Sequence, residues 1–113
     1  MGMFRKIFFV IYCFTINAIV ASDKEGLIFI EQLLEWNIDF QNLENNKAGA
    51  ACLPISSKTN YYNALGISYS LAEIEYAKRV AMNNCQDMKR KKKILSECKC
   101  EIIFINNSFI GVK

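Results

Sequence analysis

Histidine is absent from the sequence of 113 residues. The chain therefore lacks the commonest general base and the commonest metal ligand of proteins. This absence excludes a Ser-His-Asp or Cys-His nucleophile and any zinc site built with imidazole. The best pair of carboxylates, Glu73 and Glu75, cannot act together because residues two apart on a helix point in different directions. We therefore predict that the protein is not an enzyme, with no catalytic, cofactor-binding or metal-binding residue and no cofactor.

A long hydrophobic run occurs only at the N-terminus. The stretch IFFVIYCFTINAIVA follows Arg5 and Lys6 and precedes the polar SDKE. A basic start, an apolar middle and a small residue at the end are typical of a secretory signal peptide. We predict a signal peptide over residues 1–21, with cleavage after Ala21 or after Ser22. An uncleaved membrane anchor is the alternative, although the run is shorter than the roughly 20 residues that cross a bilayer.

A strong net charge of either sign is also lacking. The whole chain has 14 basic and 11 acidic residues, and Arg5 and Lys6 leave with the signal peptide, so the mature chain has 12 against 11. This balance gives no reason to expect nucleic acid as a partner. Residues 22–113 are then one small domain, exported to the periplasm or outside the cell. The expected partner is a protein or another envelope component, and a membrane only through an uncleaved signal segment.

Four cysteines remain in the mature chain: Cys52, Cys85, Cys98 and Cys100. An even number of cysteines in a small exported chain predicts disulfide bonds. Cys98 and Cys100 are two apart on a predicted strand and would close a very small, strained ring, so each should pair elsewhere. We expect one bridge from Cys85 to Cys98 or Cys100, and a second bridge from the remaining member of that pair to Cys52.

The first mature segment, residues 22–44, is predicted to be a helix. Ser22 and Glu25 have the spacing of a capping box. Apolar residues then recur at three-four spacing, which places them on one helical face: Phe29, Leu33, Trp36, Phe40 and Leu43. Alternation in LEWNIDF favours a strand instead, but the length of the pattern favours a helix over residues 24–43. Such a stripe is usually core, and the alternative is a binding face around Trp36.

The middle of the chain is predicted to contain a loop, a strand and a second helix. Residues 45–60 hold the only proline, Pro54, among small and polar residues, which indicates a connecting loop. Alternation in residues 63–69 predicts a strand. Ser70 and Glu73 form a second capping-box pattern before the helical stretch LAEIEYAKRVAMNNCQDM. The small alanines of this helix would let it lie close against a sheet.

The C-terminal stretch CKCEIIFINNSFI is apolar on both sides, which is typical of a central strand. Asn106 and Asn107 predict a tight turn, and SFIGVK a short edge strand. The predicted fold is a small disulfide-stapled α+β domain: a three-stranded antiparallel or mixed sheet with a helix packed across it, preceded by an N-terminal helix. The basic residues 89–93 are interpreted as a solvated turn at a helix end, with a weak contact to anionic lipid or cell-wall polymer as the alternative.

A resemblance covers about residues 61–110. The stretch YNALGISYS, the helix LAEIEYAKRVAMNNC and the stretch CKCEIIFINNSFI together resemble a group of small exported bacterial domains of unknown function. In that group a strand precedes an alanine-bearing helix that closes with cysteine, and a cysteine-led strand follows. This chain departs from the pattern in its second cysteine, Cys100, and in having few small residues before the helix. The resemblance implies a fold and an exported location, with no activity.

Two functional hypotheses follow from the sequence. The leading one is an exported, non-enzymatic binding or interaction module that is envelope-associated or inhibits another protein. The alternative is a thiol-based metal-binding or redox protein, because the C-x-C pair of Cys98 and Cys100 offers two soft ligands for copper(I) or zinc.

Overall fold

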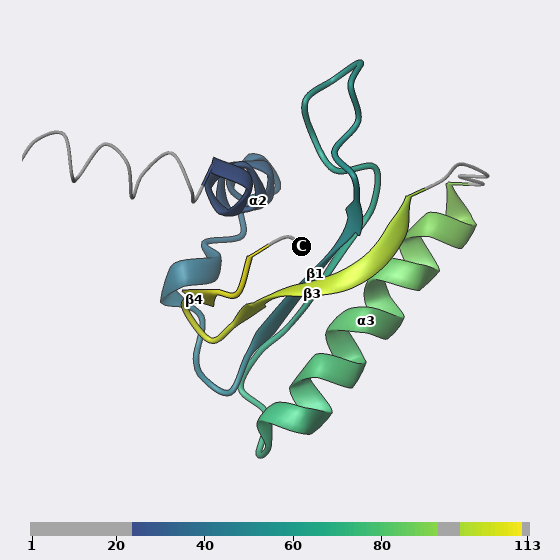
Figure 1. Cartoon of the computed structure of the whole chain (residues 1–113). Coiled ribbons are helices and arrows are strands. Elements are labelled where there is room, and N and C mark those ends of the chain that lie inside the picture. Colours follow the sequence, from purple (N-terminus) through teal and green to yellow (C-terminus); the bar gives the residue numbers. More distant parts are fainter. Residues whose placement is uncertain (1–23, 93–97, 112–113) are drawn as a thin grey trace, which may run out of the picture.

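Two helices enclose a four-stranded antiparallel sheet in the computed structural model (Figure 1). The structure describes residues 24–92 and 98–111. In chain order the elements are α2 (Lys24–Glu35), the short 3-10 helix η1 (Phe40–Asn42), β1 (Ala48–Leu53), β2 (Leu65–Ser68), α3 (Ile74–Lys91), β3 (Lys99–Ile105) and β4 (Ser108–Phe109). The predicted small α+β fold is confirmed. The predicted signal peptide and the capping residue Ser22 lie outside the described residues.

The sheet has four strands instead of the three expected, because part of the predicted loop forms β1. The strand order is β2-β1-β3-β4, so β1 lies near the middle of the sheet. Its sequence is AGAACL, and every residue except Leu53 is buried. The small side chains of this segment suggest a loop. In the structure they allow β1 to be covered by a helix on each face of the sheet. At Gly49, for example, an added Cβ would lie 2.6 Å from the ring of Phe29.

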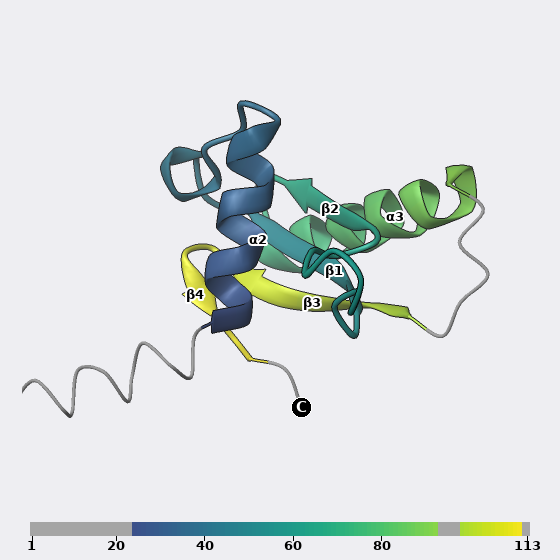
Figure 2. The same ribbon diagram turned by 90° about the horizontal axis from the view of Figure 1, so that it is seen from above.

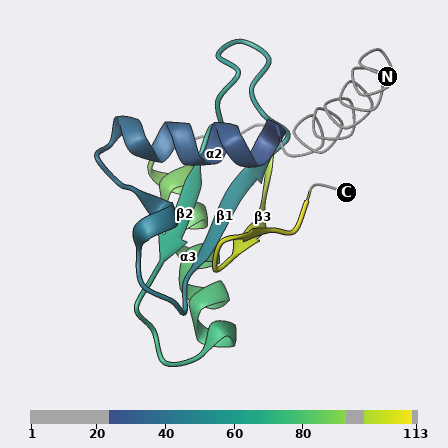
Figure 3. The same ribbon diagram turned by 90° about the vertical axis from the view of Figure 1, so that its left-hand side faces the viewer.

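The sheet separates two cores of different composition (Figures 2 and 3). The α2-side core holds large apolar side chains and one alanine: Phe29, Ile30, Leu33, Phe40, Ala51, Tyr62, Leu65, Ile103 and Phe104. The buried residues of the α3-side core are alanines and cysteines: Ala48, Ala50, Cys52, Ala64, Ala77, Ala81, Cys85, Cys98 and Cys100. Because these side chains are small, the backbone of α3 comes very close to the sheet. A Cβ added at Gly66 would lie 2.3 Å from the backbone oxygen of Ala81.

Helix α2 ends at Glu35, well before the predicted end at residue 43. Asn37 adopts a left-handed conformation with φ of 63°, which stops the helix. The amide of Ile38 donates to the Leu33 carbonyl at 3.0 Å, as in a Schellman motif. Trp36 lies at this turn and is 42% exposed, so its predicted place in the core stripe is wrong. The other members of the stripe do pack in or against the α2-side core.

Helix α3 confirms the predicted second helix, but it lacks the predicted capping box. The helix begins at Ile74, and the cap residue Glu73 makes no side-chain capping hydrogen bond. Ser70 has a φ of 57°, and its hydroxyl donates to the Glu44 carboxylate at 2.9 Å. Ser70 therefore fixes the connection before the helix to the segment that follows η1.

Strand β3 is central, as predicted, and contains a β-bulge. Gly49 lies opposite Phe104 and Ala50 lies opposite Ile102. Ile103 between them therefore has no partner residue on β1. A bulge interrupts the alternation of side chains between the two faces. It lets Ile103 and Phe104 both enter the α2-side core, where simple alternation would place them on opposite faces.

The predicted turn and short edge strand are confirmed, although the strand covers Ser108–Phe109 only and residues 112–113 lie outside the described residues. The chain turns at Asn106, which has a φ of 54°, and returns as the edge strand β4. Within the residues that the structure describes, no helix has the length and apolar character needed to cross a membrane.

Candidate functional site

All four cysteines predicted to form disulfides do so. Cys52 pairs with Cys98, with Cα atoms 5.1 Å apart, and Cys85 pairs with Cys100, with Cα atoms 6.1 Å apart. The structure therefore resolves the open pairing question: Cys100 holds α3 to the sheet, and Cys98 holds the end of β1. Disulfides form and persist in an oxidising environment, and this pairing is consistent with an exported protein.

The register of the sheet explains this choice of partners. Cys52 lies directly opposite Cys100 on the neighbouring strand, and both side chains belong to the α3-side core. Cys85 is on the buried face of α3, where it meets Cys100. The remaining partner for Cys52 is Cys98, which directly precedes β3.

The disulfide cluster is closed to solvent. Cys52 and Cys85 are fully buried, and Cys98 and Cys100 are 4% and 5% exposed. While bonded in this way, none of the sulfur atoms is a thiolate, so thiol chemistry would first require reduction. Residues 24–92 and 98–111 contain no group of three or more Cys, Asp or Glu residues placed to hold a metal ion. A metal-binding or redox role for Cys98 and Cys100 therefore stays a prediction, and it applies only to the chain with reduced disulfides.

Lys47 is a fully buried cation directly before β1, and no sequence pattern predicts it. Its Nζ donates to the carbonyl oxygens of Phe40 at 2.7 Å, Gln41 at 3.1 Å and Leu43 at 2.9 Å. It also lies 4.9 Å from the centre of the Phe40 ring. Burial lowers the pKa of Lys47 from 10.5, and the Asp39 carboxylate opposes this effect. Lys47 thus fastens the segment that follows α2 to the sheet.

Replacing Lys47 with methionine keeps the buried aliphatic chain and removes the donors to these carbonyls. We expect the free energy of unfolding to fall by about 2 kcal/mol near pH 7. Because the pKa of Lys47 is lowered in the folded chain, the unfolded chain binds more protons between that pKa and 10.5. The wild-type protein therefore gains stability with rising pH in this window, whereas the variant has no such gain. The difference in the free energy of unfolding between the wild type and the variant, measured with urea, should be larger near pH 10 than near pH 7.

The matched control for this experiment is Lys91→Met, because Lys91 is exposed in the last turn of α3. This variant should unfold like the wild type at both pH values. A Lys47→Met difference that stays constant or narrows toward pH 10 would contradict the assigned role of burial.

The connection between β1 and β2 is fixed to α2 by two tyrosines. The side-chain amide of Gln32 donates to the Tyr62 carbonyl at 3.0 Å, and the Tyr62 amide donates back to its oxygen at 2.9 Å. The Tyr62 hydroxyl donates to the Glu25 carbonyl, and burial raises the pKa of Tyr62. The Tyr61 hydroxyl donates to the Glu35 carboxylate, and this hydrogen bond raises the pKa of Tyr61. The part of this connection that holds the two tyrosines is therefore fixed to α2, and the rest of the connection projects beyond the helix (Figure 3).

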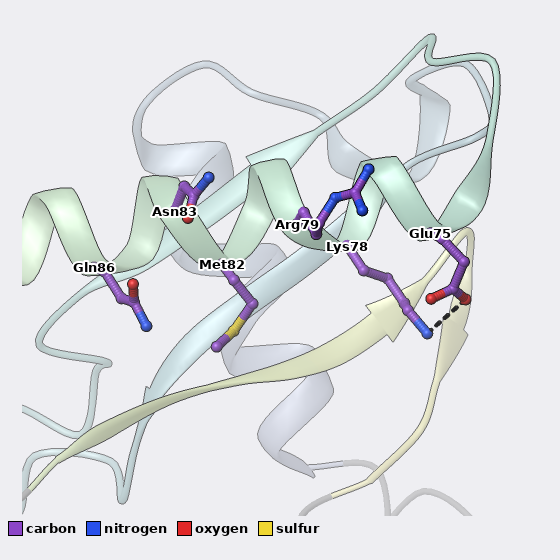
Figure 4. A pocket seen from close by; sticks show the side chains of 6 residues that line it. All are labelled: Glu75, Lys78, Arg79, Met82, Asn83 and Gln86. Atoms are coloured by element: carbon purple, nitrogen blue, oxygen red, sulfur yellow. Dashed lines mark ion pairs between the residues drawn. The ribbon is translucent and has the colours of Figure 1, made fainter.

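The described surface includes a larger and a smaller hollow. One, of about 420 Å³, lies between the start of α2 and the β1–β2 connection and is lined by Lys24, Glu25, Ile28, Ile55, Ser56, Ser57 and Asn60. The other, of about 260 Å³, follows α3 and is lined by Glu75, Lys78, Arg79, Met82, Asn83 and Gln86 (Figure 4). An ion pair of 2.9 Å between Lys78 and Glu75 crosses the second hollow.

The exposed surface of α2 carries large apolar side chains. Leu27 is 48% exposed, Leu34 is 47% exposed, and both lie on one flank of the helix because they are seven residues apart. Trp36 follows at the C-terminal turn. The carboxylates of Glu31 and Glu35 are exposed beside them. We refer to Leu27, Glu31, Leu34, Glu35 and Trp36 as the α2 surface.

The predicted basic run lies at the opposite side of the sheet, at the end of α3. Lys89, Arg90 and Lys91 form the last turn and Lys92 is the cap, while residue 93 lies outside the described residues. Lys89 donates to the Cys98 carbonyl at 2.6 Å, and Arg90 pairs with Asp87. Basic side chains here suit the negative end of the helix dipole, as expected for a solvated helix end.

Comparison of the chain with protein-family models, with curated proteins and with solved structures finds no match.

Proposed function

We propose that this chain is an exported, non-enzymatic binding module that acts on another protein in the periplasm or outside the cell. The signal-peptide pattern supports export, and the two disulfides suit an oxidising compartment. The resemblance to small exported bacterial domains belongs to the same proposal. In this role the protein is associated with the envelope or inhibits its partner.

One observation carries the binding role: the α2 surface exposes Leu27, Leu34 and Trp36 together, on one helix and the turn that ends it. Large aromatic and apolar side chains dominate the energetic centre of many protein interfaces. The α2 surface also carries Glu31 and Glu35, with which a basic rim would be complementary. The proposed partner is therefore a protein surface with an apolar centre and basic residues around it.

The test uses the mature protein with its disulfides intact. Partners crosslinked to it in the exported fraction are identified, purified and titrated against it. We expect the double substitution Leu27→Ser and Leu34→Ser, and separately Trp36→Ser, to weaken binding by at least about tenfold. These side chains are exposed, so the fold should persist.

The matched control is Tyr76→Ser on α3, because Tyr76 is 48% exposed and lies away from α2. This variant should bind like the wild type. The proposal is wrong if no purified partner binds, or if the α2 variants and the Tyr76 variant bind equally well.

A further inference from the structure

The outer edge of β3 is only partly covered. Strand β4 pairs with its end alone, where Phe104 lies opposite Phe109 and Ile105 lies opposite Ser108. The amide of Ile110 adds one more hydrogen bond, to the Ile103 carbonyl at 2.9 Å. Before Ile103, no strand among the described residues pairs with this edge. Figure 2 shows β4 beside one end of β3 only.

The hydrogen-bonding groups on this open edge follow from the sheet register. Cys52 lies opposite Cys100, but the Cys52 amide donates to Ala64 on the β2 side, at 2.8 Å. Cys52 and Cys100 are thus a pair without mutual hydrogen bonds, and the amide and carbonyl of Cys100 point to the outer edge. Alternation brings both backbone groups of Ile102 to the same edge. Such a row of backbone groups is a template for another strand.

We propose that a second copy of this chain pairs with this edge, β3 against β3 in antiparallel orientation, about a twofold axis at Cys100. The two Cys100 residues would then exchange two backbone hydrogen bonds. Cys98 of each copy would face the partner's Ile102. The two four-stranded sheets become one continuous sheet with both α3 helices on the same face. This surface is separate from the α2 surface, so the inference does not rest on the proposed function.

Charge complementarity identifies the second copy as the occupant. Lys99 and Glu101 flank Cys100, and both are exposed. They lie on the α2 side of the sheet, because their neighbours on β1 are Leu53 and Ala51. Twofold pairing at Cys100 places each Lys99 directly opposite the partner's Glu101, which gives two cross-strand pairs of opposite charge.

Other registers are less favourable for identifiable reasons. An axis at Glu101 would place two glutamates opposite each other, and an axis at Lys99 would do the same with two lysines. An axis at Ile102 would require pairing with the part of β3 at Phe104 that β4 already covers. Of these registers, the one centred on Cys100 is therefore the most favourable for pairing at this edge.

The flank of α3 beside this edge is compatible with the arrangement. Met82 packs against the core that holds Cys100, and Figure 4 shows it extending from α3 together with Lys78. Lys89 on the same flank binds the Cys98 carbonyl, which fixes the start of the edge. In the pair, the hollow beside Met82 would face the equivalent hollow of the second copy.

The test measures the dimer dissociation constant by sedimentation of the disulfide-intact mature chain from micromolar to millimolar concentration. Lys99→Glu or Glu101→Lys alone replaces two attractive pairs with two repulsive pairs. Each should raise the dissociation constant by about tenfold or more. The double variant with both substitutions exchanges the charges and should restore the wild-type constant.

Mixing the two single variants provides a second readout, because a mixed pair again places opposite charges across the interface. The mixture should form a dimer that neither variant forms alone at the same concentration. Both residues are exposed, so a disulfide map and circular dichroism should match the wild type. A chain that stays monomeric at millimolar concentration, or a dimer that the charge variants do not change, would overturn the proposal.

Discussion

Replacing Cys52 and Cys98 together with alanine is expected to lower the free energy of unfolding by about 4 kcal/mol. The bridge joins residues 46 apart in the sequence, and its main effect is to restrict the unfolded chain. It holds the end of β1 to the residue before β3, at the base of the projecting connection between β1 and β2. A small domain has a total stability of about 5 to 15 kcal/mol, so the loss is a large fraction of the free energy of unfolding.

The Cys85 and Cys100 double alanine variant is the matched comparison. Its bridge spans 15 residues, and the same chain-entropy relation gives a loss of about 3 kcal/mol. Urea unfolding of the oxidised proteins should therefore rank the wild type first, this variant second and the Cys52 and Cys98 variant third. The reverse order of the two variants would show that the longer loop is not the more important constraint.

Gly66→Ala is expected to lower the free energy of unfolding by about 3 kcal/mol, which is large for the addition of one methyl group. An added Cβ would lie 2.3 Å from both the Ala81 oxygen and the Cys85 nitrogen. These atoms belong to the backbone of α3 and cannot move aside as a side chain would. The helix would have to shift away from β2 while the Cys85–Cys100 disulfide holds it to β3.

Gly26→Ala is the control for this substitution. There the added Cβ would lie 3.0 Å from the Phe109 ring, which is a partly buried side chain at the sheet edge and can shift. Alanine also favours a helix over glycine by about 1 kcal/mol. We expect Gly26→Ala to be close to neutral in thermal and urea unfolding. Equal losses for the two variants would contradict the close contact between α3 and β2.

The elements with strong local signals could be predicted from the sequence. Helix α3, strands β2 and β3 and the turn at Asn106 all follow from periodicity and turn chemistry. The end of α2 has a recognisable signal as well, because asparagine readily adopts the left-handed conformation found at Asn37. The apolar pattern nevertheless continues past Asn37, because Phe40 of η1 packs in the same core as the apolar residues of α2. The sequence therefore suggests a helix longer than the one that forms.

Features that depend on distant partners could not be predicted in this way. Strand β1 consists of small residues that resemble a loop until helices cover both faces. The choice between Cys98 and Cys100 depends on the register of β1 against β3, which the spacing of cysteines does not contain. Lys47 can be buried because carbonyls of η1 and of its cap Leu43 accept hydrogen bonds from it, and a lysine among small residues has no local pattern that indicates such a role.

The proposed export and the two disulfides can be tested together. Intact mass measurement of the exported protein, with and without reduction and followed by peptide mapping, tests both most directly. We expect a chain that begins after Ala21 or Ser22 and gains four hydrogen atoms on reduction. Its peptides should be linked as Cys52–Cys98 and Cys85–Cys100. An intact N-terminal segment, free thiols in the unreduced chain or a Cys98–Cys100 bridge would contradict this expectation.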